Sequence, residues 1–188
     1  MKVPQNAKKV FTGQIFDVYQ WEQVMYDGSW ATFEMLGRPD TVEVIATSGE
    51  QIYYARQSQP TKDEFIGLFG GRVEEGEEPL VAAKRELKEE SGMESDDWEL
   101  YRVYEPYHKM DWRIHVYIAK NCVKNAPQTL DSGEKISVVS TSFEDFITLV
   151  TSEGYTGREL AQDIMRMRLG PPHALVEFKS MLFGKNPK

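Results

Sequence analysis

The chain is poor in cysteine and has no long apolar run, and each absence excludes a class of protein. Cys122 is its only cysteine, so no intramolecular disulfide can form, and a reducing cytoplasm is the expected compartment. We do not expect Cys122 to be catalytic. The opening MKVPQNAKKV is not followed by an apolar stretch of signal-peptide length, and no later stretch approaches the length of a membrane span. We therefore expect a cytoplasmic protein with no membrane partner.

Positive charge is also scarce. The chain has 22 lysines and arginines against 30 aspartates and glutamates, which gives a formal net charge of -8. This balance disfavours broad electrostatic attraction to nucleic acid or to anionic membranes. An anionic small molecule would need metal cations to offset its charge. With 188 residues and no internal repeat, the chain is expected to form one domain of ordinary size with terminal additions.

One acidic segment, GRVEEGEEPLVAAKRELKEESGM, occupies residues 71–93. Its second half is predicted to be helical, because Pro79 suits a first helical position and Gly92 suits a left-handed stop. Glu77 and Glu78 would lie near the positive end of the helix dipole. Spacings of three and four residues then place three acids on one face, beside an apolar stripe. The acids are Glu86, Glu89 and Glu90, and the stripe is Leu80, Ala83 and Leu87.

This acidic face has two interpretations, a solvated helix surface or a cation site. Like charges so close repel one another, and hard divalent cations with oxygen ligands are their natural compensation. The order of the residues favours the cation site, because the segment resembles the Nudix box. That motif reads Gly, five residues, Glu, seven residues, Arg-Glu, an aliphatic residue, any residue, Glu-Glu, any residue, Gly and an aliphatic residue. Every fixed position is filled, by Gly71, Glu77, Arg85, Glu86, Leu87, Glu89, Glu90, Gly92 and Met93.

The resemblance to the Nudix hydrolase superfamily implies metal-dependent hydrolysis of a pyrophosphate bond. Such a reaction needs cations on the phosphate oxygens, an activated water and accurate positioning. The resemblance implies that Mg²⁺ or Mn²⁺ is bound by Glu86, Glu89, Glu90 and the backbone carbonyl of Gly70. It also places Arg85 in the catalytic set, as an internal ion-pair partner of Glu77 that orients the loop and the helix; direct phosphate binding by Arg85 is the alternative.

The general base stays open between two positions. In many Nudix enzymes a box glutamate activates the water, which here means Glu89 or Glu90. In the ADP-ribose branch, which this chain resembles, the base is instead a glutamate on a mobile loop after the box. The corresponding loop, DSGEK at residues 131–135, contains Glu134. A polar loop with glycine is typical of a movable catalytic loop and equally typical of a surface turn.

The order of predicted elements resembles the Nudix fold, an α/β fold of the α+β type in which a mixed β-sheet is sandwiched between α-helices, here with an N-terminal β extension. Strands are predicted at residues 15–25, 30–36, 41–47, 51–57, 98–104, 112–119 and 136–140. After the acidic helix, further helices are predicted at residues 142–152, 156–169 and 173–182, the first two with Ser142 and Thr156 as caps. We divide the chain into an N-terminal β region (1–40) for dimerisation, a Nudix hydrolase domain (41–170) and a C-terminal helix with a polar tail (171–188), in which disorder is expected from residue 184.

Outside the box, RPDTV at residues 38–42 and YARQ at residues 54–57 resemble the ADP-ribose and nucleotide-sugar pyrophosphatase branch. The chain departs from that branch with RQSQ at residues 56–59, where an aromatic residue and a second arginine are usual, and with FGG instead of Pro-Ala-Gly at residues 69–71. The resemblance implies cleavage of ADP-ribose or a nucleotide sugar into a nucleoside monophosphate and a sugar phosphate. Alternatives are dinucleoside polyphosphates, nucleoside triphosphates, and a non-catalytic module that binds nucleotide sugars.

Two residues are candidate substrate contacts. Arg56 ends a predicted strand just before the loop that leads to the box, and a guanidinium matches phosphate oxygens in paired geometry; a surface ion pair is the alternative. Trp30 is available to stack on adenine, and so are Trp21 and Phe33, although each could equally be a core or dimer contact. The N-terminal strands also resemble the part that pairs between subunits in the ADP-ribose branch, so we expect a twofold homodimer.

Overall fold

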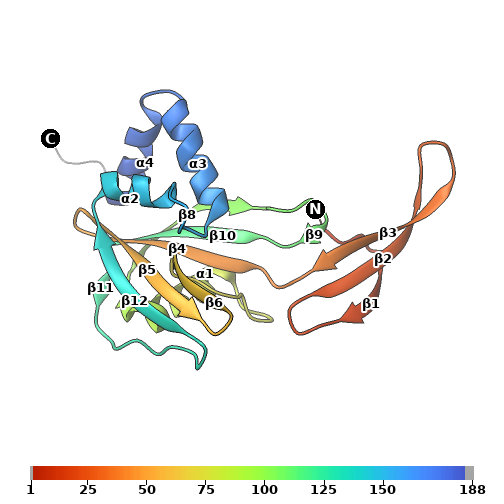
Figure 1. Ribbon diagram of the computed structural model, residues 1–188, viewed down its shortest axis with the longest axis horizontal. Helices are drawn as coiled ribbons and strands as arrows, with labels where there is room; N and C mark the ends of the chain where they lie inside the picture. The colour runs from red at the N-terminus through yellow and green to blue at the C-terminus, as the bar shows by residue number, and fades with distance from the viewer. Residues whose placement is uncertain (1, 185–188) are drawn as a thin grey trace.

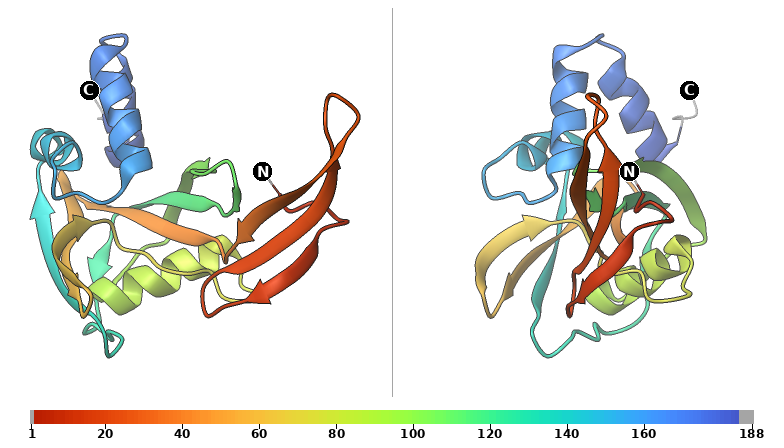
Figure 2. Two further views of the ribbon diagram at one scale, coloured as in Figure 1. Left: turned by 45° about the vertical axis from the view of Figure 1, so that its right-hand side comes forward. Right: turned by 90° about the vertical axis from the view of Figure 1, so that its right-hand side faces the viewer.

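Residues 2–184 of the chain are described by a computed structural model (Figure 1). They form a main sheet with helices on both faces and a second sheet that projects from one end (Figure 2). The expected mixed sheet between helical layers is therefore present. The polar tail, for which disorder is expected, lies outside the described residues from residue 185 onward. No helix in the described part is long and apolar enough to cross a membrane.

The projecting sheet, which we call the arm, consists of β1 (Lys8–Thr12), β2 (Asp17–Val24) and β3 (Trp30–Gly37), all antiparallel. The short strand β9 (Met110–Asp111) adds to the base of β3 in parallel. The strands predicted at residues 15–25 and 30–36 correspond to β2 and β3. The prediction misses β1 because all its residues are exposed, so that KKVFT has no alternation between a buried and an exposed face.

The main sheet has the strand order β12, β5, β4, β10 and β8, with β6 paired to the other edge of part of β5. Its strands are β4 (Thr41–Ser48), β5 (Gln51–Gln59), β6 (Lys62–Gly67), β8 (Asp97–Tyr104), β10 (Ile114–Lys120) and β12 (Lys135–Thr141). Only β4 and β10 run parallel, which makes the sheet mixed. A separate small sheet joins β7 (Met93–Glu94) to β11 (Val123–Lys124). The prediction misses β6, whose first residues are polar and exposed.

The predicted strand at residues 112–119 is divided between the two sheets. Met110 and Asp111 pair with the arm, whereas the chain joins the main sheet only at Ile114. Trp112 and Arg113 therefore lie in the crossing between the sheets and not in a strand. The predicted core face is correct for Ile114, Val116 and Ile118, all of which are buried.

Helix α1 (Pro79–Ser91) covers one face of the main sheet. It begins with Pro79 in its first turn and ends at Gly92, whose φ of 71° is left-handed and whose amide donates to the carbonyl of Lys88. A Cβ at position 92 would overlap the carbonyl oxygen of Ala126, so glycine is required there by space as well as by conformation. The predicted apolar stripe packs on the sheet, with Ala83 and Leu87 fully buried.

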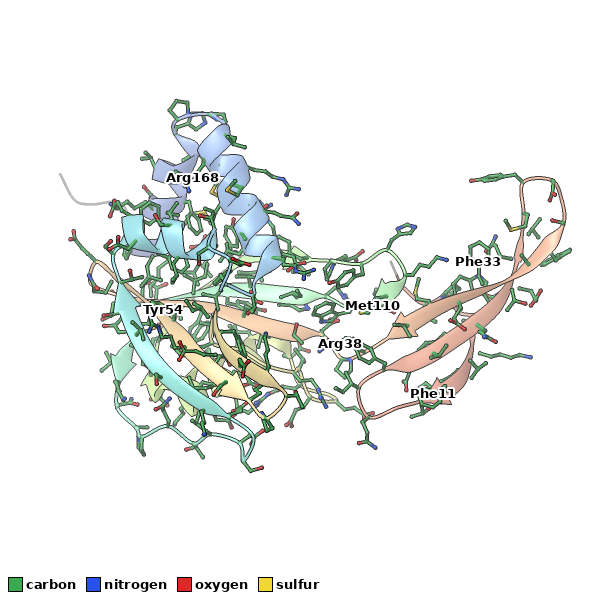
Figure 3. The ribbon with its side chains drawn as sticks, viewed as in Figure 1. Phe11, Phe33, Arg38, Tyr54, Met110 and Arg168 are labelled. Carbon is green, nitrogen blue, oxygen red and sulfur yellow. The ribbon has the colours of Figure 1, made fainter. Side chains whose placement is uncertain are left out.

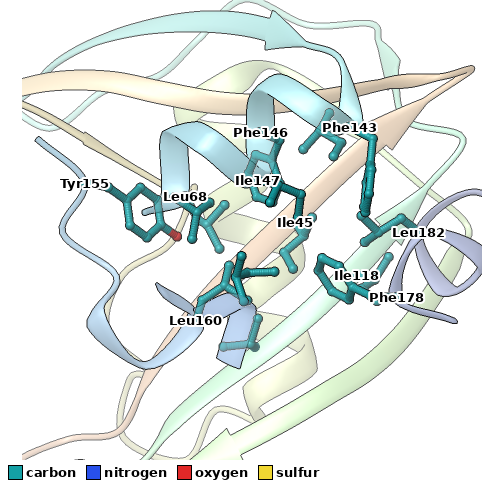
Figure 4. Close-up of a cluster of buried hydrophobic side chains, with 14 of the residues drawn as sticks. Ile45, Leu68, Ile118, Phe143, Phe146, Ile147, Tyr155, Leu160, Phe178 and Leu182 are labelled. Atoms are coloured by element: carbon teal, nitrogen blue, oxygen red, sulfur yellow. The ribbon is translucent and has the colours of Figure 1, made fainter. Parts of the chain in front are cut away.

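The opposite face is covered by α2 (Phe143–Val150), α3 (Arg158–Leu169) and α4 (Ala174–Phe183), whose apolar side chains form the larger core cluster with the sheet (Figure 4). The Ser142 cap is confirmed, because its hydroxyl accepts from the amide of Asp145. The Thr156 cap is wrong. Gly157 holds the cap position of α3, and the Thr156 hydroxyl donates to the carbonyl of Ile66 on β6 instead.

Candidate active site

The acidic face of α1 borders a cleft of about 380 Å³. Its walls come from the loop before α1, from α1 itself and from the loop between β11 and β12. The lining residues are Gly71, Arg72, Glu74, Arg85, Glu86, Glu89, Glu90, Thr129, Asp131 and Glu134. The three predicted metal-binding glutamates and Glu134 are thus brought to one place, although Glu134 is far from them in sequence.

Glu90 is the most buried acid of the cleft, with 4% of its surface exposed. Its Oε2 accepts a 2.7 Å hydrogen bond from the amide of Gly70, which joins the helix to the loop before it. Gly70 has a φ of 153°, and a Cβ there would overlap the carbonyl oxygen of Val42. Glycine is therefore needed at position 70 to bring this stretch of backbone against β4 and under Glu90.

Arg85 is the cation around which the box is organised. Its Nε and one terminal nitrogen donate to the two oxygens of Glu77, at 3.1 and 3.0 Å. The other terminal nitrogen donates to Glu86 at 2.7 Å and to Glu89 at 3.1 Å, and a further bond reaches the carbonyl of Arg72. The paired bonds to Glu77 raise the pKa of Arg85 and lower that of Glu77. This guanidinium is committed to protein partners, which fits the predicted orienting role.

Burial and mutual repulsion disfavour the charged forms of two of these acids. Burial raises the pKa of Glu90 to about 9, with further increases from the charges of Glu86, Glu134 and Glu89. Burial also raises the pKa of Glu86, although its bonds to Arg85 oppose that shift. The electrostatics of the cleft therefore favour an additional positive charge.

The donors in the cleft suit a hard divalent cation, because they are carboxylate oxygens carrying more negative charge than Arg85 offsets. Each of the three predicted metal-binding glutamates places one oxygen on a protein donor: Glu86 and Glu89 on Arg85, and Glu90 on the amide of Gly70. Within residues 2–184, no three acidic, histidine or cysteine side chains are already arranged to hold a metal ion. The residues fit a divalent cation in chemistry, although here one oxygen of each glutamate is engaged with a protein donor.

Glu134 enters the cleft from a turn at the tip of its loop. Its amide donates to the carbonyl of Asp131 at 3.0 Å, and its Oε2 accepts from the amide of Asp131 at 3.3 Å. Its charge contributes to the raised pKa values of Glu86 and Glu90. The loop position therefore places a carboxylate within electrostatic reach of the box acids.

The two predicted substrate contacts are not among the residues that line this cleft. Arg56 lies exposed on β5. Trp30 is the first residue of β3, at the end of the arm that is remote from the main sheet, and 66% of its surface is exposed. Both roles stay predictions, and that of Trp30 requires the arm to reach the cleft of another subunit.

Arg72, Glu74 and Thr129 line the cleft without having been singled out in the sequence. The available signal for Arg72 is its place directly after the first box glycine, in a loop that must lie beside the acids. Arg38 lies nearby, where the arm meets the main sheet (Figure 3). Its guanidinium lies 4.5 Å from the ring centre of Trp112 and 5.5 Å from that of Phe16. Burial lowers the pKa of Arg38, and the charge of Arg72 lowers it further.

Comparison with known proteins agrees with this geometry. The model of the NUDIX domain family matches residues 37–161. An ADP-ribose pyrophosphatase of Bacillus subtilis (strain 168) is 27% identical over 166 residues, which cover 86% of this chain and 90% of that protein. A methanol dehydrogenase activator of Bacillus methanolicus is 25% identical over 150 residues, covering 77% and 80%. A crystal structure of an ADP compounds hydrolase shares the fold with a TM-score of 0.71 and 18% identity, covering 88% of this chain and 92% of that one.

Proposed function

The chain belongs to the Nudix family and is a Nudix pyrophosphohydrolase, and from this premise we propose that its substrate is a nucleoside diphosphate linked to a sugar, with ADP-ribose or a nucleotide sugar first. The products are a nucleoside monophosphate and a sugar phosphate. The observation that carries the proposal is the cleft in which Glu86, Glu89, Glu90 and Glu134 meet beside Arg72. The similarity to a protein named ADP-ribose pyrophosphatase supports the choice of substrate.

We propose that Glu86, Glu89, Glu90 and the carbonyl of Gly70 hold Mg²⁺ or Mn²⁺. When bound, such a cation neutralises phosphate oxygens and makes the phosphorus more open to attack by water. The chain's own contribution is to fix the carboxylates. Arg85 orients Glu86 and Glu89, while the Gly70 amide holds Glu90.

We propose Glu134 as the general base that takes a proton from the attacking water. It faces the box acids across the cleft, and its loop position separates proton transfer from cation binding. A carboxylate on a short turn can also approach and leave as substrate enters and products depart. Glu89 and Glu90 are the alternatives, since either could accept the same proton.

Arg72 and Arg38 support a substrate with a diphosphate and a further group. Arg72 is exposed on the wall of the acidic cleft, where it can meet a phosphate oxygen. Arg38 lines a neighbouring cavity of about 590 Å³ between the arm and the main sheet. Its Nε is buried and has no hydrogen-bond partner within residues 2–184, and its guanidinium lies over the ring of Trp112. We propose that this cavity takes the part of the substrate beyond the diphosphate.

We further propose a twofold homodimer in the cytoplasm. The arm exposes large apolar side chains, which an isolated subunit would leave in water. These are Val10, Phe11, Ile15, Phe16, Val24, Tyr26 and Trp30. In such a dimer we propose that Trp30 of one subunit stacks on the nucleotide bound by the other.

A substrate panel tests the function. ADP-ribose, other nucleotide sugars, diadenosine polyphosphates and nucleoside triphosphates would be compared by kcat/KM with excess Mg²⁺. We expect a sugar linked through a diphosphate to have the highest value, because its diphosphate would lie in the cleft and its remaining group in the neighbouring cavity. A preference for triphosphates or diadenosine polyphosphates would refute the proposed substrate. Binding of nucleotide sugars without turnover of any compound would favour the non-catalytic module.

A further inference from the structure

The loop that carries Glu134 begins by docking on the C-terminal end of α1. The last carbonyls of an α-helix have no partner inside the helix, and here this loop supplies their donors. The amide of Thr129 donates to the carbonyl of Glu89 at 2.8 Å. The amides of Asn125 and Ala126 both donate to the carbonyl of Gly92, at 3.1 and 3.2 Å. The first part of the loop is thus fixed to the helix that bears the metal-binding acids.

Gln128 adds a side-chain connection that the backbone alone does not make. Its Nε2 donates to the carbonyl of Glu90 and, at 3.2 Å, to the carbonyl of Ile136. Glu90 is a cleft acid, and Ile136 is in β12 just after Glu134. Both protons of one partly buried amide are therefore used to join the end of α1 to the strand that follows the loop.

These contacts define which part of the loop is free. Thr129 is held by α1, and Ile136 is held by Gln128 and by β12. Because Lys135 already pairs with Ser58 at the start of β12, only residues 130–134 are free of these contacts, and their tip is the Asp131 to Glu134 turn. Bringing the ends of a short segment together limits the positions that its tip can occupy. The two anchors therefore set how far Glu134 stands from the carboxylate of Glu90.

We propose that Gln128 is a positioning residue, which places Glu134 opposite the box acids by tying the carbonyl of Glu90 to that of Ile136. Gln128 is not among the residues that line the cleft, so it acts through Glu134 and not on the substrate. The proposal rests on the proposed role of Glu134 as the base. In this role Gln128 attaches the loop to the C-terminal end of α1.

The test is a cycle of three variants: Gln128→Met, Glu134→Gln and the double variant. Methionine keeps the length of the side chain and removes both donors. We expect Gln128→Met to lower kcat by about 10- to 100-fold, as displacement of a reacting group by about 1 Å does. KM and the Mg²⁺ concentration for half-maximal rate should change little. In the Glu134→Gln background the same substitution should lower kcat no further, because the residue it positions is already inactive.

The matched control is Asn125→Ala, which removes a side-chain hydrogen bond from the same loop to Glu94, away from Glu134. It should leave kcat near the wild-type value. If Gln128→Met does not fold, Gln128→Asn keeps the donor group on a shorter side chain that cannot span both carbonyls, and it should show the same dependence on Glu134.

Three outcomes overturn the proposal: an unchanged kcat in Gln128→Met, an equal loss in both backgrounds, or a loss matched by Asn125→Ala. The single Glu134→Gln variant separates this failure from failure of the proposed base. If that variant is inactive while Gln128→Met is fully active, only the positioning role is wrong. If Glu134→Gln is fully active, the base assignment is wrong, and positioning through it is overturned as well.

Discussion

Oε2 of Glu90 lies 2.7 Å from the amide nitrogen of Gly70, so the most buried acid of the cleft is bonded to the backbone of the loop before α1. The bond joins an acid of the cleft to a glycine of the loop beside it, and the two positions have different requirements. Glu90 supplies a buried carboxyl oxygen, and Gly70 supplies an amide that only a glycine can place there, at a φ of 153° against the carbonyl of Val42. The proposed metal binding by Glu90 would therefore be coupled to the packing of the loop on β4.

Gly70→Ala should weaken both the proposed metal binding and the packing of the loop on β4. The added Cβ overlaps the Val42 carbonyl and strains the backbone, so we expect a loss of about 1 to 3 kcal/mol in the free energy of unfolding, together with a higher Mg²⁺ requirement. Gly76→Ala is the control, because Gly76 also has a positive φ, of 80°, but has open space around it. Urea unfolding and Mg²⁺ titration of the rate provide the measurements. Equal effects from both variants would show that backbone strain alone, and not the fit against β4, is responsible.

The stability of the metal-free protein should fall as the pH rises. The pKa of Glu90 is about 9 in the folded state against 4.5 for an unperturbed glutamate, so between these values the folded state holds a proton that the unfolded state has released. The stability contributed by this proton is then complete below the lower value, falls steadily between the two values and is gone once the pH has risen through the upper one. Glu43, whose pKa burial raises to about 7, adds to the loss at lower pH.

Thermal unfolding in a chelator between about pH 5 and pH 9 measures this loss. Glu90→Gln should make the loss shallower over the whole range and abolish it between about pH 7 and pH 9, where Glu43 is already ionised in both states and only Glu90 contributes. Mg²⁺ should raise the Tm of the wild type more at high pH than at low pH, because the ion competes with the proton on Glu90. A Tm that is independent of pH and of Mg²⁺ would mean that the acidic face of α1 is a solvated surface.

The acidic helix could be predicted from the sequence because its determinants are local. Pro79 at the start and Gly92 at the stop both act within one turn of the helix, and the spacing of Glu86, Glu89 and Glu90 fixes their common face. The proposed metal-binding residues follow mostly from this local spacing on one helix. The strands of the main sheet were also predicted where an apolar face repeats.

Contacts between distant segments could not be predicted in this way. Gln128 meets Glu90 across 38 positions of sequence, and no local pattern distinguishes this glutamine from one in solvent. Arg38 lies against Trp112 only because the chain crosses between the two sheets after β9. The preference of threonine for helix N-caps likewise favoured Thr156 as a cap. Its hydroxyl instead donates to the carbonyl of Ile66 on β6, a contact that no local pattern predicts.

Arg72→Ala should weaken substrate binding. Arg72 is the exposed cation of the cleft, whereas Arg85 is fully engaged with Glu77, Glu86 and Glu89. A charged hydrogen bond to phosphate contributes about 1.5 to 3 kcal/mol, so we expect KM to rise by about 10-fold or more while the Mg²⁺ requirement is unchanged. Steady-state kinetics with the best substrate of the panel measures this. Arg158→Ala, which removes an exposed arginine outside the cleft, should have no effect, and an equally silent Arg72→Ala would exclude the phosphate contact.

The arm should hold two subunits together. Phe11 and Trp30 are 58% and 66% exposed, and their burial against a second copy would stabilise a dimer. Sedimentation at micromolar concentration should show a dimer for the wild type and a monomer for Phe11→Ser with Trp30→Ser. Val176→Ser is the control, because Val176 is 63% exposed on α4 and away from the arm. A wild type that sediments as a monomer would contradict the assignment.

Glu90 and Glu134 should differ in what their substitution removes. Glu90→Gln keeps the shape and removes a charged oxygen ligand, so the rate should fall sharply and the Mg²⁺ concentration for half-maximal rate should rise. Glu134→Gln should lower kcat by about 10²- to 10⁴-fold, the range of general acid–base residues, with little change in KM or Mg²⁺ requirement. Asp131→Asn controls for charge on the same turn, since Asp131 also lines the cleft. If Glu134→Gln stays nearly fully active across neutral pH, proton transfer belongs to Glu89 or Glu90, and the loop serves substrate binding alone.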